Sequence, residues 1–140
     1  MDYKRINNTI MARIDKGEEI VLKVMEICEK ENIKLANVNA LGAVDEIVIG
    51  LFDTVEKKYY SEKFKGDFEI VSLTGSITTM DGKLYNHLHM SVGDREYNVR
   101  GGHLNSAVVS ATCELFIHII DGAVERKFND EVGLNLLNLS

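Results

Sequence analysis

The sequence predicts an α+β fold, in which one main helix covers an antiparallel or mixed, curled β-sheet of about seven strands. Only residues 18–32 repeat apolar side chains at helical spacing. From Ile33 onward the chain consists of short apolar runs broken by Gly, Asp and Lys, a pattern typical of strands. A doubly wound parallel sheet needs a crossover helix between successive strands, so a chain with one helix cannot form it.

The length of the chain indicates one domain, residues 1–140. A chain of 140 residues with 45% hydrophobic content can bury a core without disulfides or metal. Cys28 and Cys113 form no metal-binding or secreted disulfide pattern, so we expect two buried free thiols in a reducing cytosol. The charged N-terminus lacks the apolar core of a signal peptide, and no window reaches the length of a membrane span. We therefore expect a cytoplasmic protein with no membrane partner.

The first elements are a strand and the helix. Residues 3–14 have the pattern of one short strand, and the sequence Asp-Lys-Gly then leads into the helix. Glu18 and Glu19 are expected in the first helical turn, where a negative charge is favourable against the helix dipole. Asn32 is expected to end the helix.

The remaining strands are expected to pair mostly with their neighbours in sequence. Their runs are LANVNALGAV, EIVIGLFD, KKYYSEKF, FEIVSLTGSITTM, LYNHLHMSV, REYNVRGG and ATCELFIHII. Residues 80–83 and 92–95 carry hairpin turn signals, which favours antiparallel pairing. Residues 104–111 are expected to form a short helix or a loop. Because FEIVSLTG and CELFIHII are apolar on both faces, part of the sheet must be covered twice, by the helix and by another subunit.

The charge of the chain disfavours a general polyanion-binding surface. Sixteen Lys and Arg residues stand against 22 Asp and Glu residues, for a net charge of −6, so nucleic-acid binding would need a local basic patch. The stretch KKYYSEKFK mixes lysines with aromatic residues, but Glu56 and Glu62 dilute its charge. A solvated hairpin with charged edges is the favoured interpretation.

Three histidines carry the most distinctive chemistry. His87 and His89 are two residues apart in a predicted strand, so their imidazoles should project from the same face. His103 follows Gly101 and Gly102. In a regular hairpin with Gly93 and Asp94 at its tip, His103 would point to the other face. A β-bulge at the glycine pair would bring it into the set, and so would a neighbouring subunit.

Three neutral imidazoles with an open fourth position suit a divalent metal. Zinc is the first expectation, while nickel, iron and copper stay open on ligand type alone. His118 lies in an apolar run without a partner of metal-ligand type, so we expect it to be structural. Glu69 also lies in a run that looks buried and should then need a cation such as Arg13 or Arg100. A structural ion pair is favoured over a general base at Glu69.

Several segments together resemble the plants-and-prokaryotes-conserved (PPC) domain in order and spacing. They are RIDKGEEI, GDFEIVSLTGSI, HLHMSV, GGHL, TCELFI and ERKFNDEVGLNLL, and the HxH and GGHL elements are the most specific. The resemblance implies an antiparallel-sheet domain with a flanking helix, a homotrimer, and a metal site of His87, His89 and His103 at or near the subunit interface. In plant members the domain follows basic AT-hooks that bind A/T-rich DNA. This chain has no proline and therefore no Arg-Gly-Arg-Pro hook, and Asp67 replaces the basic residue of the plant partner-recruitment stretch.

Four functions follow from these observations. The first is a homotrimeric metal-binding protein that takes a small molecule or an ion. The second is a DNA-associated regulatory protein, which the family name and the lysine-rich hairpin favour and which the net charge and the missing hook disfavour. The third is a metal-dependent hydrolase or lyase with Glu69 or Glu96 as base, since a metal lowers the pKa of bound water to about neutrality. The fourth is an oligomeric scaffold with structural histidines. No nucleophile elbow, phosphate loop or dinucleotide motif is present, so a binding protein is favoured over an enzyme.

Overall fold

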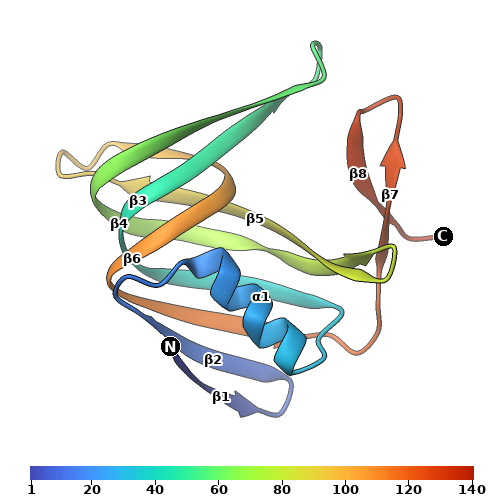
Figure 1. Ribbon diagram of the computed structural model, residues 1–140, viewed down its shortest axis with the longest axis horizontal. Coiled ribbons are helices and arrows are strands. Elements are labelled where there is room, and N and C mark those ends of the chain that lie inside the picture. The colour runs from blue at the N-terminus through green and yellow to red at the C-terminus, as the bar shows by residue number, and fades with distance from the viewer.

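The computed structural model describes residues 1–140 and contains one helix and eight strands (Figure 1). The elements are β1 (Asp2–Ile6), β2 (Thr9–Asp15), α1 (Ile20–Lys30), β3 (Ala36–Asp53), β4 (Lys58–Met80), β5 (Lys83–Gly93), β6 (Val99–Ile119), β7 (Glu125–Asn129) and β8 (Leu134–Asn138). The predicted α+β class and the antiparallel or mixed sheet under one main helix are confirmed. No helix in the structure has the length and apolar character that crossing a bilayer requires.

The sheet curls until its middle strands close on themselves. Its strand order is β1-β2-β6-β3-β4-β7-β8, and β5 pairs with both β4 and β6. The strands β3, β4, β5 and β6 therefore form a closed ring of antiparallel pairs. The only parallel contact joins β4 to β7. In Figure 1, α1 lies across the sheet near β2 and β6, and the β7–β8 hairpin stands at the other side of the molecule.

The helix is fixed by its two ends and by its apolar face. Glu18 and Glu19 precede α1 and do not form its first turn, which corrects the prediction. Glu19 is the N-cap, and its carboxylate accepts hydrogen bonds from the backbone N–H groups of Val21 and Leu22. Asn32 follows the helix at a φ of 55° and stops it, as predicted. The buried side chains of α1 then join the 27-residue core of the sheet.

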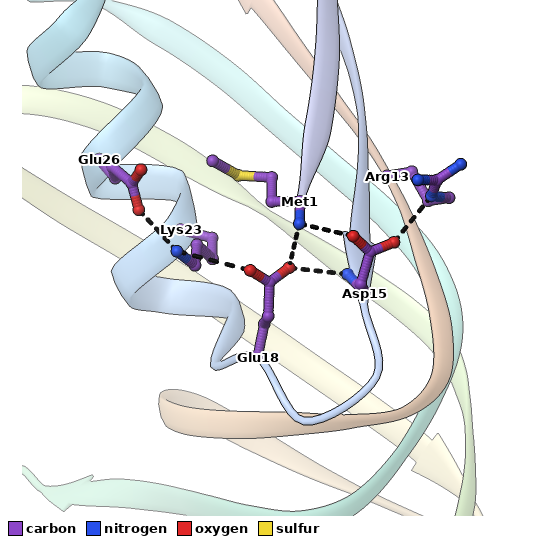
Figure 2. Close-up of polar contacts among 6 residues, drawn as sticks. All are labelled: Met1, Arg13, Asp15, Glu18, Lys23 and Glu26. Carbon is purple, nitrogen blue, oxygen red and sulfur yellow. Dashed lines mark hydrogen bonds and ion pairs between the residues drawn. The ribbon is translucent and has the colours of Figure 1, made fainter.

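A network of charged groups ties the start of α1 to β2. The amino group of Met1 lies 2.6 Å from Asp15 Oδ2 and 2.7 Å from Glu18 Oε2 (Figure 2). Lys23 bridges Glu18 and Glu26 from the helix, and Arg13 pairs with Asp15 on the strand side. These contacts position the loop that leads into α1.

The strands are longer than the apolar runs predicted. The first two runs merge into β3, the next two into β4, and the last two into β6. Residues 104–111 are part of β6, so the predicted short helix or loop is wrong. The register of β6 against β3 shifts between Ile49, which pairs with Leu104, and Val48, which pairs with Ser106. The extra residue, Asn105, breaks the alternation that would have revealed a strand.

The chain ends add two hairpins. Residues 3–14 form the β1–β2 hairpin and not one strand, with Asn7 in the left-handed region at its turn. The β7–β8 hairpin was not predicted. The turn at residues 80–83 is confirmed, because Met80 pairs with Lys83 and both Asp81 and Gly82 have positive φ, as a two-residue hairpin turn requires.

The face of the sheet opposite α1, here called the outer face, carries one continuous row of paired residues. Residues paired across neighbouring strands point to the same face. The row runs through Met11 on β2, Phe116 on β6, Asn39 on β3, Thr74 on β4 and His89 on β5. Leu41 and Val71, which are 57% and 59% exposed, line a depression beside Phe116 on this face. The outer face therefore holds both exposed apolar side chains and a histidine.

Candidate metal centre

The three histidines come from the hairpin that joins β5 to β6. His89 pairs directly with His103, and Gly93 pairs with Val99, in a register without a bulge. The predicted two-residue tip and glycine bulge are therefore wrong. The connection is a five-residue loop, residues 94–98, in which Asp94 Oδ1 accepts hydrogen bonds from the backbone N–H groups of Glu96 and Asn98. The longer loop shifts the register and places His103 on the same face as His89.

The histidine side chains converge on one point. Each offers one ring nitrogen, and these three atoms lie within 4.8 Å of one another. The ring centroids are 5.1 Å apart for His87 and His89, 5.3 Å for His87 and His103, and 5.6 Å for His89 and His103. Zinc–nitrogen bonds of about 2.0–2.1 Å need the three atoms somewhat closer, which small ring rotations supply. The structure therefore brings the three residues of the predicted set together.

Two glycines allow the strands to approach beneath the histidines. Gly50 on β3 pairs with His103, and a Cβ atom on Gly102 would lie 2.5 Å from the Gly50 backbone oxygen. Real Cβ atoms do not tolerate that distance, so the backbone at Gly102 requires glycine. The pair Gly101-Gly102 thus serves close packing of β6 against its neighbours and not a bulge.

Burial keeps two of the three histidines, His87 and His103, in the neutral form that binds metals. The pKa of His87 is lowered to about 4, mainly by the loss of hydration and also by the positive charge of Arg126 and by the neighbouring histidines. Burial also lowers the pKa of His103, with a smaller contribution from His89. Both imidazoles are therefore neutral at pH 7 and present a lone pair to a metal. The cluster contains no carboxylate.

A pocket of about 770 Å³ opens beside His87 and His103. Long-range pairing brings its walls together from β3, β4, β5, β6 and the β7–β8 hairpin. It is lined by Phe52, Tyr59, Ser76, Tyr85, His87, His103, Arg126, Gly133, Leu134, Asn135, Leu136 and Leu137. No Asp or Glu belongs to this lining. An open position on a metal held by the histidines would face a space large enough for a small organic ligand.

Sequence reasoning missed the pocket residues outside the histidine set. Tyr59 lies edge-on to His103 at 5.8 Å between ring centroids, and its hydroxyl donates to Asn105 Oδ1. Tyr85 and Arg126 form a second pair, with the guanidinium 4.8 Å from the ring centroid. In the sequence, Tyr59 is one aromatic residue of the lysine-rich stretch and Arg126 is one residue of a segment that carries the family resemblance. The local sequence pattern gives no signal for these residues, because pairing between strands that are distant in sequence brings them to the site.

The other predicted site residues lie elsewhere. Glu69 is exposed and makes no ion pair, so the expected buried pair with Arg13 or Arg100 is wrong. Those arginines pair instead with Asp15 and Asp94. Alternation explains the error, since Phe68 and Ile70 are buried on the inner face and Glu69 points outward. His118 is exposed, lies 3.3 Å from Thr9 Oγ1 and stacks on Phe116, apart from the histidine cluster.

Comparison with known proteins assigns the family. The profile of the Plants and Prokaryotes Conserved (PCC) domain matches residues 1–121. The chain belongs to this family. No curated protein matches the PCC-domain chain.

Solved structures resemble the PCC-domain chain over nearly its whole length. A candidate DNA-binding protein of Bacteroides thetaiotaomicron is 31% identical with a TM-score of 0.95, over 98% of this chain and 96% of that one. A metal-containing protein of Archaeoglobus fulgidus is 33% identical with a TM-score of 0.89, over 99% of both chains. A plant- and prokaryote-conserved (PPC) protein of Pyrococcus horikoshii is 31% identical with a TM-score of 0.85, over 98% of this chain and 93% of that one.

Proposed function

We propose that this PCC-domain protein is a homotrimer in which each subunit binds one divalent ion through His87, His89 and His103. Zinc is the leading candidate for this ion. The observation that carries the proposal is the convergence of three ligating nitrogens within 4.8 Å in a cluster without carboxylates. Nitrogen-only ligand sets suit zinc and its first-row neighbours and not the oxygen-seeking magnesium or calcium. The metal-containing relative from Archaeoglobus fulgidus supports the same interpretation.

The open position of the ion serves ligand binding in this proposal. A metal with three protein ligands keeps a fourth site for water or a ligand, and the pocket beside His87 and His103 supplies room for one. A hydrolase or lyase would also need a general base near that position. Glu69 is exposed on β4, Glu96 lies in the 94–98 loop, and no carboxylate lines the pocket. Binding of a small molecule is therefore favoured over turnover.

Oligomerisation would cover the outer face. Met11, Leu41 and Val71 are 45%, 57% and 59% exposed in the single chain. Exposed apolar side chains that gather on one face are typical of protein interfaces. Because His89 belongs to the row of paired residues on the same face, an interface there would lie near the metal site.

DNA binding is the second candidate, since the similar protein from Bacteroides thetaiotaomicron is named as a candidate DNA-binding protein. The pairing of charges in the lysine-rich hairpin of β3 and β4 opposes DNA binding by this protein. Lys63 and Lys65 both pair with Glu46, at 2.6 Å and 2.8 Å, and Lys57 donates to the backbone of Asp130. Paired lysines release few counterions on contact with phosphates, and the net charge is −6. DNA binding would show as a strongly salt-dependent gel shift.

Elemental analysis of the purified protein tests the metal proposal. The wild type and His118→Ala should each carry one divalent ion per subunit, whereas His103→Ala and the double variant His87→Ala/His89→Ala should lose it. His118→Ala is the matched control, because it removes an exposed histidine of β6 outside the cluster. Absence of metal from wild-type protein that was expressed in zinc-supplemented medium and purified in the presence of zinc would overturn the proposal. Light scattering on the same samples would separate a metal site from a purely structural role of the histidines.

A further inference from the structure

Arg126 is the only arginine of the chain without a carboxylate partner. Arg5, Arg13, Arg95 and Arg100 each pair with an Asp or Glu. None of the chain's ion pairs includes Arg126, although it is only 8% exposed and the others are far more accessible. A charge removed from water without a counter-charge is costly, so the position of Arg126 calls for an anion.

The guanidinium of Arg126 is held in one orientation. Its Nε–H donates to Thr78 Oγ1 at 2.9 Å, and an Nη1–H donates to the backbone oxygen of Asn135 at 2.9 Å. Its Cζ atom lies over the ring of Tyr85, 4.8 Å from the centroid, and the Tyr85 hydroxyl accepts a hydrogen bond from Asn135 Nδ2. Arginine has five N–H donors and Arg126 uses two of them in these bonds, so donors remain for a ligand in the pocket that Arg126 lines. A fixed guanidinium with free donors matches an oxyanion such as a carboxylate or phosphate.

The rest of the pocket fits the same ligand class. Arg126 lines it together with His87 and His103, and no carboxylate of the lining balances the charge of Arg126. Phe52, Leu134 and Leu136 supply an apolar wall on the other elements. A volume of about 770 Å³ is in the range of small-molecule sites and too small for a macromolecular partner.

We propose that the pocket binds a small organic oxyanion, whose anionic group pairs with Arg126 beside the histidine cluster and whose apolar part lies against Phe52 and the leucines of β8. The proposal rests on the proposed function in that it places the ligand beside the metal site. Its own evidence is the unpaired, buried charge of Arg126. Two classes of ligand combine an oxyanion with an apolar body in this way, namely carboxylates and phosphorylated compounds.

Isothermal titration with three probes of one shape tests the proposal. Phenylacetate is the carboxylate, benzylphosphonate the phosphate analogue and phenylacetamide the neutral control, each titrated at millimolar concentration into zinc-loaded and metal-free protein. At least one anion should bind and the amide should not. The anion that binds more tightly would show whether the pocket prefers carboxylates or phosphorylated compounds. Equal binding of the amide, or no binding of either anion to either form, would overturn the proposal.

Two variants assign the anion to Arg126. Arg126→Gln should weaken anion binding by about tenfold or more, the size expected for a lost charged hydrogen bond. Asn135→Asp keeps Arg126 and its backbone hydrogen bond but places a competing carboxylate in the pocket, so it should also weaken binding. Asn138→Asp adds the same charge at an exposed position of β8 outside the pocket and should bind as the wild type does. Unchanged affinity in both pocket variants would contradict the proposal.

The outcomes separate this inference from the metal proposal. Wild-type protein that retains zinc but binds neither anion refutes the oxyanion site alone. Wild-type protein that takes up no zinc even when zinc is supplied, and that still binds phenylacetate in an Arg126-dependent way, refutes the metal site alone. Elemental analysis of each variant should show unchanged zinc, because none of the changes removes a histidine.

Discussion

At the scale of single residues, Gly102 links the packing of the sheet to the proposed metal site. A Cβ atom there would lie 2.5 Å from the backbone oxygen of Gly50, so the β3 and β6 backbones must separate to admit it. His103 is the next residue and would move with its strand. Gly102→Ala should therefore lower the free energy of unfolding by about 1–3 kcal/mol and also weaken zinc binding. Chemical denaturation and elemental analysis measure the two effects.

Gly93→Ala is the matched control for Gly102→Ala. A Cβ atom on Gly93 would lie 3.6 Å from a methyl group of Val71, which is ordinary contact, and Gly93 sits at the other end of the same hairpin. This variant should keep both stability and zinc. Full zinc occupancy in Gly102→Ala together with wild-type stability would show that the close approach of β3 and β6 does not position His103.

The histidine set was predictable in part. Strand alternation alone places His87 and His89 on one face, and this is what the structure has. His103 was predicted through a bulge that does not exist, since the length of the 94–98 loop depends on the hydrogen bonds that Asp94 makes within it. Arg126 could not be found, because its place in the pocket depends on the packing of the β7–β8 hairpin against β4.

At the scale of elements, the contact between α1 and the sheet can be followed through two thiols. Cys28 on α1 and Cys113 on β6 are both fully buried. Burial raises the pKa of each thiol from 9.0 to about 12. Because only the thiolate reacts with iodoacetamide, both should resist alkylation at mildly alkaline pH and react when denaturant releases the helix. Mass spectrometry counts the added groups.

The same thiols give stability a dependence on alkaline pH. Their folded pKa lies above the unfolded value, so the native state holds these protons more tightly. Their contribution to stability is complete below pH 9.0 and is lost as the pH rises toward about 12. A Cys28→Ala/Cys113→Ala variant should show a flatter decline in stability over that range. Rapid alkylation of native wild-type protein would contradict this account of the α1 contact.

Element boundaries were the least predictable feature of the fold. The apolar runs were identified correctly, but their fusion into β3, β4 and β6 was not, because bulges interrupt the alternation inside long strands. Register shifts occur between Ala40 and Gly42 and between Val44 and Glu46 on β3, as well as at Asn105 on β6. These irregularities bend the strands so that the sheet closes. The alternation of apolar and polar residues predicts strand segments that are regular and straight. It does not predict that a strand continues through a bulge where the sheet curves.

At the scale of the whole molecule, the outer face bears on whether the protein is a monomer or a trimer. Leu41 is 57% exposed and lines the depression beside Phe116, so a charge there leaves the core of the single chain intact. If the trimer forms through this face, Leu41→Asp should place three like charges in an apolar interface and dissociate it. Light scattering should report about three times 15.7 kDa for the wild type and about 15.7 kDa for the variant.

The metal content of the dissociated variant then separates two architectures. All three histidines lie in one chain, with their ligating atoms within 4.8 Å, so Leu41→Asp should keep its zinc as a monomer. Loss of zinc on dissociation would mean that a neighbouring subunit completes the site. Leu22→Asp is the control, because Leu22 is 68% exposed on the helix, away from the outer face. Retention of the trimer in Leu41→Asp and its loss in Leu22→Asp would move the interface to the helical side, and the exposed row beside His89 would then be free to meet a different partner.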